Sequence, residues 1–247
     1  MQFHIATDAE ELNHEVAIWI INYINQVLKK QDRFTLVLAG GNTPKQLYSL
    51  LASDNLKAKV EWKKVHFFWG DERYVPITDE QSNAKMVMDT LLNKVEVPKE
   101  NIHVMRTDVD AELSASEYEE LLHQFFGSGP TTNDSQTHTF DLVLLGLGNN
   151  AHTLSLFPGY PVIREKDAWV QAVYIKEMKM QRITLTPPVV NAAHRVAFLV
   201  SGADKAASLH HVLEDIHDPD QFPAQIIQPY NDELYWWTDD AAAKDLD

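Results

Sequence analysis

The sequence of 247 residues contains no cysteine, which excludes disulfides, thiolate metal sites and a cysteine nucleophile. It also lacks a run of about 18 uncharged apolar residues, the length that a membrane-spanning helix needs. Residues 1–15 are polar and acidic, whereas a secretory signal is basic and then apolar. These absences predict a protein of the cytoplasm.

Positive charge is also scarce in this chain. It has 21 Lys and Arg residues against 36 Asp and Glu, a formal net charge of −15. Affinity for nucleic acid or an anionic membrane is built largely from Lys and Arg facing phosphates, so we expect neither as a partner. The acidic excess serves solubility, while a small anion can still bind where a few cations and backbone N–H groups converge.

Short apolar segments alternate with amphipathic ones along the chain. Helices are predicted at residues 9–30, 45–51, 82–94, 111–126 and 203–215. Strands are predicted at residues 34–39, 65–69, 101–105, 140–148, 169–175, 182–186, 195–200 and 234–237. Strands buried on both faces that alternate with helices predict an α/β fold: a doubly wound, mostly parallel sheet with helices on both faces.

The chain shows no internal repeat and no linker long enough to divide it, so residues 1–247 are expected to form a single domain. The polar segment 127–139 is expected to connect two halves of one sheet and is a candidate for a mobile loop. The aromatic segment 234–237 is expected to be a core strand, not a platform for stacking a sugar.

Three segments place polar residues just after predicted strands, at the edge where open α/β sheets bind ligands. The first is GGNTP (40–44), with Thr43 as the expected N-cap of a helix and Pro44 at its first position. Its glycines allow a close backbone approach, and a helix N-terminus offers N–H groups to a phosphate. The P-loop ending Gly-Lys-Ser/Thr is missing, and a plain tight turn would look the same.

The second segment is WGDERYVP (69–76). Its two acids and Arg73 can supply a base and an anion clamp, or they can form an ion pair within a polar loop. The third segment, residues 146–159, contains His152 after an apolar strand and a Gly-x-Gly turn. We expect His152 at the start of a short helical stretch, with an accessible ring and a pKa suited to proton transfer.

The segments GGNTP, WGDERYVP, GLGNNAHTLSLFPG, RITLT and SGADKA occur in this order, and together they resemble the 6-phosphogluconolactonase family, which is related to glucosamine-6-phosphate isomerases/deaminases. The resemblance implies a Rossmann-like, doubly wound α/β sheet. It also implies hydrolysis of 6-phospho-D-glucono-1,5-lactone to 6-phosphogluconate in the oxidative pentose phosphate pathway, with no cofactor.

The resemblance implies roles for individual residues. His152 would be the acid/base residue, and Asp71 would lie near the sugar ring. The implied substrate and phosphate ligands are Gly40, Gly41, Asn42, Thr43, Arg73, Arg182 and Lys205. One histidine can activate water and then protonate the departing ring oxygen. The tetrahedral intermediate carries an oxyanion, which backbone N–H groups of Gly146 and Gly148 can stabilise.

The sequence departs from the family directly before the histidine. Most relatives have Pro-Asp-Gly there, whereas this chain has Asn149-Asn150-Ala151. Asn150 can still orient the ring by accepting a hydrogen bond, but it brings no negative charge, so we expect a nearby acid to supply it. The replacement of Gly by Ala151 predicts a backbone that does not need a positive φ at this position.

Two other functions stay open. An amino-sugar-phosphate isomerase/deaminase typically has an acid a few positions after the histidine, whereas residues 153–158 contain none. A non-catalytic sugar-phosphate-binding relative would keep Arg73 and Lys205 without hydrolysing a lactone. No metal is assigned, because the adjacent His210 and His211 point to different faces of a helix. We expect a monomer or a small homo-oligomer.

Overall fold

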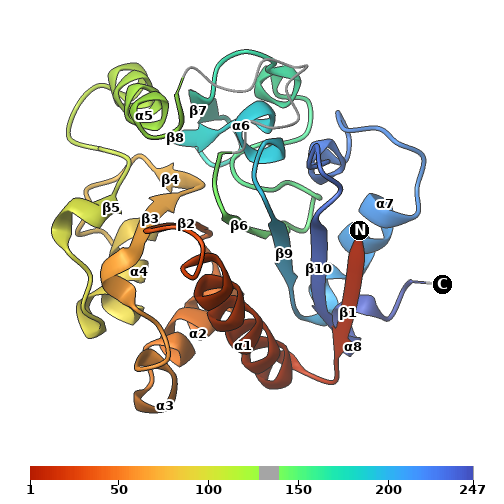
Figure 1. Ribbon diagram of the computed structural model, residues 1–247. Helices are drawn as coiled ribbons and strands as arrows, with labels where there is room; N and C mark the ends of the chain where they lie inside the picture. Colours follow the sequence, from red (N-terminus) through yellow and green to blue (C-terminus); the bar gives the residue numbers. More distant parts are fainter. Residues whose placement is uncertain (128–138, 247) are drawn as a thin grey trace.

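A seven-stranded sheet forms the centre of the computed structural model, which describes residues 1–127 and 139–246 (Figure 1). Its strands, in spatial order, are β1 (Gln2–Ala6), β10 (Leu234–Asp239), β9 (Val196–Val200), β6 (Leu142–Gly146), β2 (Phe34–Leu38), β3 (Val65–Trp69) and β5 (Ile102–His103). Every neighbouring pair is parallel. The predicted doubly wound sheet is therefore confirmed.

The order of the strands places a change of direction at the centre of the sheet. From β2 the chain moves outward through β3 to the edge strand β5, and it then returns to β6 and moves the other way through β9 and β10. The neighbours β2 and β6 therefore mark the topological switch point, where the connections after the two strands diverge and leave a crevice.

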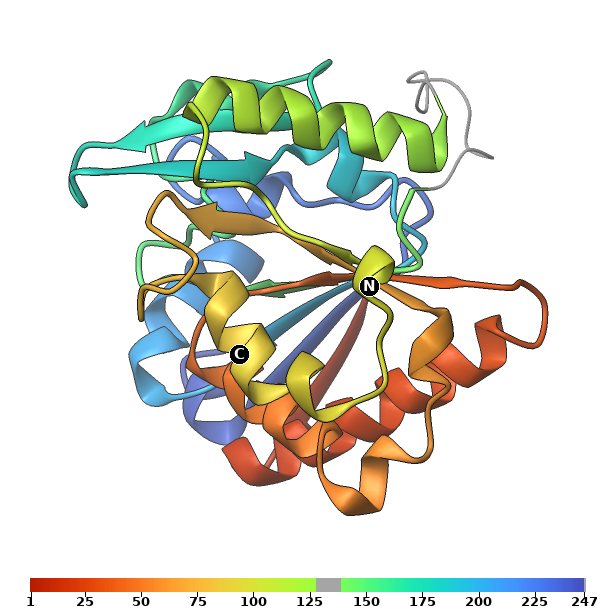
Figure 2. The same ribbon diagram turned by 90° about the vertical axis from the view of Figure 1, so that its left-hand side faces the viewer.

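Helices cover both faces of the sheet. Figure 2 shows α1 (Ala9–Val27), α2 (Asn42–Leu51) and α4 (Asn83–Thr90) together on one face, while α5 (Ala111–Phe126) lies on the opposite side. Parallel strands need crossover connections, and a right-handed crossover changes face when the direction of winding changes. The remaining helices are α3 (Asp54–Lys57), α6 (Pro187–Asn191), α7 (Ala206–Leu213) and α8 (Asp240–Ala243).

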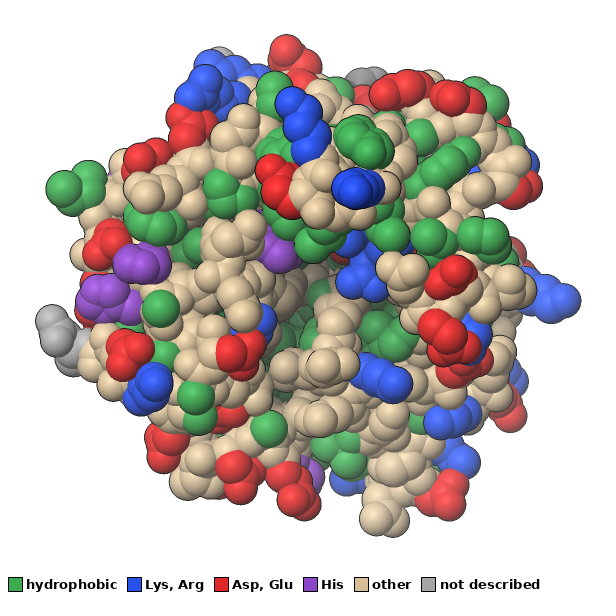
Figure 3. Space-filling model, turned by 180° about the vertical axis from the view of Figure 1, so that it is seen from behind, with side chains coloured by type: hydrophobic (Ala, Val, Ile, Leu, Met, Phe, Trp, Pro, Cys, Tyr) green, Lys and Arg blue, Asp and Glu red, His purple; other side chains and the backbone are tan. Residues whose placement is uncertain are grey.

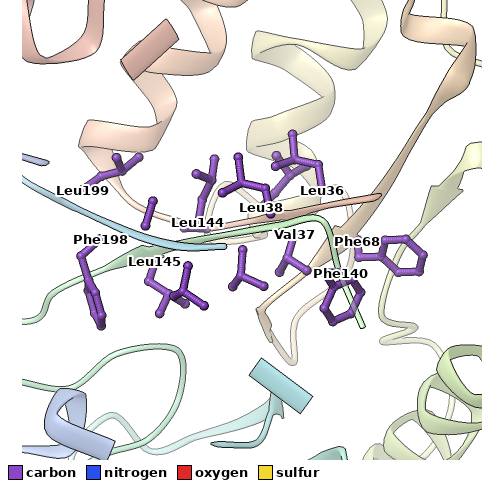
Figure 4. Packing of buried hydrophobic residues seen from close by; sticks show 14 of the residues in the cluster. Leu36, Val37, Leu38, Phe68, Phe140, Leu144, Leu145, Phe198 and Leu199 are labelled. Carbon is purple, nitrogen blue, oxygen red and sulfur yellow. The ribbon is translucent and has the colours of Figure 1, made fainter. Parts of the chain in front are cut away.

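The central strands are almost entirely apolar, as expected for strands that are covered on both faces. Figure 4 shows Leu38 and Leu144 on one side of the sheet and Val37 and Leu145 on the other, and all four side chains are buried. The aromatic side chains of β10 are also buried. The prediction of a core strand at residues 234–237 is thus confirmed.

A second, antiparallel sheet of three strands lies above the first in Figure 2. Its order is β4 (Asp71–Arg73), β8 (Met180–Leu185) and β7 (Val170–Ile175). The sequence predicted the strands at β7 and β8 but assigned them to the single large sheet, which is wrong. Residues 176–179 form a tight hairpin loop between them, and only antiparallel strands can be joined so closely.

Two strands were missed, and some predicted boundaries differ. β1 is largely exposed or half-buried, and β4 is only three residues long, so neither carries a clear apolar pattern. The helix predicted at 82–94 ends at Thr90 and is followed by a 3₁₀ turn. Residues 128–138 of the predicted mobile loop lie outside the described part of the chain.

The described residues include no helix that is both long enough and apolar enough to cross a membrane.

Candidate active site

The site begins at the carboxyl end of β2. Gly41 has a φ of 106° and is the N-cap of α2, whose first residue is Asn42. The prediction that Thr43 is the N-cap and Pro44 the first helical residue is therefore wrong. The helix starts at Asn42, two residues before Pro44, and Gly41 adopts the positive φ of the turn that precedes it. Gly40 packs on Asn83: a Cβ atom at Gly40 would lie 2.1 Å from Oδ1 of Asn83. This glycine allows α4 to approach the turn.

Asp71 follows β3 and begins β4. Its side chain is buried, and its Oδ2 atom accepts a hydrogen bond from Oγ of Ser155 at 2.7 Å. Nη1 of Arg182 lies 3.6 Å from the same oxygen. Asp71 thus joins the strand β4, the strand β8 and the loop that carries His152.

The neighbouring Glu72 has a structural role. Its carboxylate accepts the backbone N–H groups of Asn83 and Ala84, each at 2.7 Å, and these are the first two residues of α4. Burial raises the pKa of Glu72, while these backbone hydrogen bonds oppose that rise. Of the two acids in the DERYVP motif, only Asp71 faces the site.

Two arginines lie opposite each other across the β4–β8 pair. Arg73 and Arg182 are register partners, and Arg182 is 7% exposed. Among the described residues, the buried Nε atoms of both side chains find no hydrogen-bond partner, and neither does Oγ1 of Thr153. Burial lowers the pKa of Arg182. Two adjacent cations with unpaired buried donors form a setting suited to an anionic ligand.

His152 lies in a loop of turns, not at the start of a helix as predicted. Its ring stacks on Phe157 with centroids 4.0 Å apart. Nδ1 of the ring is hydrogen-bonded to Oδ1 of Asn150. An amide oxygen only accepts, so Nδ1 carries the proton and Nε2 keeps its lone pair. The predicted contact between Asn150 and the histidine is present in the structure.

The backbone before His152 differs from the sequence-based expectation. Ala151 has a φ of 59°, although the replacement of glycine predicted that no positive φ was needed there. Its N–H donates to the carbonyl oxygen of Gly148, and its own carbonyl accepts from Ala224. These contacts hold the left-handed conformation despite the unfavourable Cβ contact.

Burial lowers the pKa of His152 to about 4, so the ring is neutral near pH 7. The carboxylate of Asp71 opposes this shift, and the cations Arg182, Lys205 and Arg73 add to it. Asp71 is therefore the acid that supplies negative charge to the histidine in place of residue 150. The expectation of a pKa in the working range for proton transfer is therefore wrong, although the neutral ring is the form that a general base requires.

Gly148 gives the His152 ring its room. A Cβ atom at this position would lie 2.0 Å from Nδ1 of His152. The N–H of Gly148 donates to the carbonyl oxygen of His152 at 2.8 Å. Because this N–H is already bonded, the prediction that it binds the oxyanion is revised: Gly148 shapes the histidine loop instead.

Lys205 ends a short 3₁₀ turn after β9. Its Nζ atom donates to Oδ1 of Asn149 and lies 3.3 Å from Oδ2 of Asp204. The two asparagines before His152 thus serve different partners, since Asn149 contacts the lysine and Asn150 contacts the imidazole.

These elements enclose a cavity of about 290 Å³ at the switch point. Figure 3 shows the molecule hollowed near the centre of this face, with blue Lys or Arg side chains at the margin of the hollow. Of the predicted residues, the cavity is lined by Gly40, Gly41, Asp71, Arg73, Gly146, Gly148, His152, Arg182 and Lys205. A neighbouring hollow of about 330 Å³ shares Lys205 and adds Asn42 and Thr43.

Seven lining residues were not predicted as part of the site. Five of them stand within or next to the recognised segments, so their place in the sequence offered a signal: Ala39, Leu145, Leu147, Thr153 and Leu154. Asn83 and Met178 stand outside those segments, and Met178 lies in the β7–β8 hairpin. Among the described residues, no group of three or more His, Cys, Asp or Glu side chains could hold a metal ion.

Comparison with known proteins identifies the family to which this site belongs. The family model described as glucosamine-6-phosphate isomerases/6-phosphogluconolactonase matches residues 7–236. A 6-phosphogluconolactonase of Nostoc sp. is 40% identical over 228 residues, which cover 92% of this chain and 90% of that protein. A 6-phosphogluconolactonase of Synechocystis sp. is 37% identical over 246 residues, which cover 99% and 98%.

The solved structures agree with this result. The 6-phosphogluconolactonase from Trypanosoma cruzi aligns with a TM-score of 0.85 and 26% identity, covering 99% of this chain and 96% of that one. The chain belongs to the glucosamine-6-phosphate isomerase/6-phosphogluconolactonase family, and the resemblance recognised from its motifs is confirmed.

Proposed function

We propose that this chain hydrolyses 6-phospho-D-glucono-1,5-lactone to 6-phosphogluconate, the second reaction of the oxidative pentose phosphate pathway. One observation carries the proposal: the neutral ring of His152, oriented through Nδ1 by Asn150, shares one cavity with Arg73, Arg182 and Lys205. The names of the full-length relatives in Nostoc and Synechocystis support the same substrate.

The reaction begins with water. Nε2 of His152 takes a proton from a water molecule as its oxygen attacks the lactone carbonyl carbon C1. The resulting imidazolium then donates that proton to the departing ring oxygen as the C1–O bond breaks, which yields the open-chain carboxylic acid. The attack and the ring opening need no covalent intermediate, and every proton passes through one histidine.

The imidazolium needs negative charge nearby, and Asn150 has none. Asp71 raises the pKa of His152, so it stabilises the charged ring when the proton arrives. The dianionic phosphate contributes in the same direction, because it offsets the three cations that lower this pKa. The bound substrate thereby strengthens the base that acts on it.

The phosphate is proposed to bind Arg73, Arg182 and Lys205, where buried guanidinium donors are unpaired. Binding at this end positions C1 beside His152 without taking part in the chemistry. Gly40, Gly41, Asn42 and Thr43 are proposed to support the same end of the substrate. Gly146, at the end of β6, remains the proposed backbone donor to the oxyanion.

The two alternatives are less well supported by the site. An amino-sugar-phosphate isomerase/deaminase is expected to have an acid shortly after the histidine, and the segment after His152 supplies none. Thr153 and Leu154 line the cavity, and Ser155 is buried behind them. A non-catalytic binding protein would not need a half-buried, oriented and neutral histidine. The proposed enzyme needs no cofactor, acts in the cytoplasm, and is a monomer or a small homo-oligomer.

The direct test generates the lactone in situ with glucose-6-phosphate dehydrogenase and follows its loss above spontaneous hydrolysis. We expect His152→Ala to lower kcat by about 10²- to 10⁴-fold. The matched control is His217→Ala, which changes an exposed histidine far along the sequence and should keep wild-type kcat. Wild-type turnover of glucosamine 6-phosphate with ammonia release, or full activity of His152→Ala, would overturn the proposal.

A further inference from the structure

The hairpin loop between β7 and β8, residues 176–179, lies at the border of the cavity. The hairpin projects beyond the ends of its neighbouring strands at the left of Figure 2. Met178 is 45% exposed, yet it lines the cavity with His152 and Arg182. An exposed apolar side chain contributes less hydrophobic free energy than a buried one, so packing alone does not account for the position of Met178.

The thioether of Met178 contacts a site cation. Nη2 of Arg182 donates to Sδ of Met178 at 3.0 Å, while Nη1 of the same guanidinium lies 3.6 Å from Asp71. Sulfur is a weak and uncharged acceptor. It therefore satisfies an N–H of the nearly buried arginine without neutralising the charge that an anionic ligand would use.

The loop is fixed in place by Tyr160. The phenol donates to Oε2 of Glu177 at 2.7 Å and accepts the backbone N–H of Lys176 at 2.8 Å. Tyr160 also packs edge-on near Phe157, on which the His152 ring stacks. The position of the hairpin loop is thus linked to the loop that carries the histidine.

We propose that Met178 is a positioning residue of the substrate site, whose thioether holds the Arg182 guanidinium in place for the phosphate. The proposal rests on the function proposed above. When the phosphate binds, its anionic oxygens are stronger acceptors than sulfur and take over the N–H group. A neutral acceptor suits this role, because a carboxylate at the same place would compete with the phosphate for the arginine.

Three substitutions separate this role from simple packing. Met178→Leu keeps the apolar volume and removes the acceptor, so KM should rise roughly two- to tenfold with kcat within about twofold of wild type. Met178→Gln restores a neutral acceptor and should return KM toward the wild-type value. Met178→Glu places a carboxylate beside Arg182 and should raise KM by about tenfold or more.

Met180→Leu is the matched control, because it makes the same change at the base of the same hairpin, at a residue that does not line the cavity. KM for Met180→Leu should equal that of wild type. Equal increases in KM for Met178→Leu and Met178→Gln, or for Met178→Leu and Met180→Leu, would overturn the proposal. A fall in kcat with unchanged KM in Met178→Leu would overturn it as well.

Failure of the enzymatic function can be told apart from failure of this inference. If wild-type protein does not hydrolyse the lactone, the proposed function is wrong. The role of Met178 is then judged by titrating inorganic phosphate into wild type, Met178→Leu and Met178→Gln in a calorimeter. Weaker binding in the Leu variant alone would support the role, whereas equal dissociation constants would refute it.

Discussion

At the scale of single residues, the site is defined by how His152 is oriented and charged. Asn150 fixes the proton on Nδ1, and burial keeps the ring neutral. Asn150 carries no charge, and the carboxylate that raises the pKa of His152 belongs to Asp71 on strand β4. Orientation and charge are thus supplied by two residues instead of one.

This division of roles can be tested through the pH dependence of activity. The base must be neutral, and its pKa is about 4, so kcat/KM should fall as the pH decreases through about 4. Asn150→Asp places a carboxylate on Nδ1, which favours the imidazolium and raises this pKa. We expect the acid limb of kcat/KM to move to higher pH in profiles measured with the in situ assay.

The control for this profile is Asn55→Asp, which adds the same charge on the exposed helix α3. Its acid limb should coincide with that of wild type. If Asn150→Asp leaves the limb where it is, the hydrogen bond from Nδ1 does not control the charge of the ring.

The sequence predicted the site residues that lie inside a recognisable motif, but not those that lie outside the motifs and reach the cavity only through the fold. His152, Asp71, Arg73 and Lys205 stand in segments with a recognisable pattern. Met178 and Asn83 carry no such signal, because they reach the cavity only through the pairing of β7 with β8 and through the position of α4. Likewise, the positive φ of Ala151 is imposed by hydrogen bonds from the surrounding loop.

At the scale of elements, the connection between β4 and α4 depends on one buried carboxylate. Glu72 accepts three backbone N–H groups, from Arg73, Asn83 and Ala84, each at 2.7 Å. Glu72→Ala leaves these donors without their acceptor, so the free energy of unfolding should decrease by about 3 kcal/mol. Urea unfolding followed by circular dichroism measures this loss.

Glu80→Ala is the matched comparison, since Glu80 is an exposed acid close to the start of the same helix. The Glu80 carboxylate in the ion pair with Lys85 is exposed to solvent, so Glu80→Ala should lower the free energy of unfolding by less than about 1 kcal/mol. Similar losses in the two variants would show that Glu72 does not anchor α4.

The elements that the sequence predicted best are those with a strong apolar pattern. The strand at residues 65–69 and the helix at 111–126 have the predicted bounds. The second sheet was not recognised, although the predicted strands 169–175 and 182–186 stand too close together in the sequence for a parallel crossover and so favour an antiparallel hairpin. The pairing of β4 with β8 joins segments about 110 residues apart, and a single sequence does not contain such a contact in readable form.

At the scale of the whole molecule, several histidines are held neutral by the fold. Nδ1 of His66 lies 3.2 Å from Nε2 of His103 across the β3–β5 pair, with Phe125 against both rings and Arg33 and Glu100 nearby. Burial lowers the pKa of His103 to about 4. Burial also lowers the pKa of His66.

This predicts that the protein loses stability as the pH falls. Between pH 6.5 and about 4 the unfolded chain binds a proton at His103 that the folded protein does not, so acidification through this window favours unfolding. His103→Gln should reduce the loss between pH 7 and 5 by about 1 kcal/mol, discounted for partial exposure. Urea unfolding at the two pH values measures it, with the exposed His217→Gln as control; equal losses in both variants would contradict the prediction.

The place of β1 in the sheet also affects how the protein can be made. Gln2 pairs with Tyr235, and β1 stands at the edge of the sheet beside β10. A ribosome releases β1 first, but its partner strand emerges only after nearly all of the remaining sequence has been synthesised. Until then β9 also lacks β10, its neighbour in the sheet. The nascent chain therefore keeps β1 without its partner strand until β10 has left the ribosome, and this edge of the sheet forms only then.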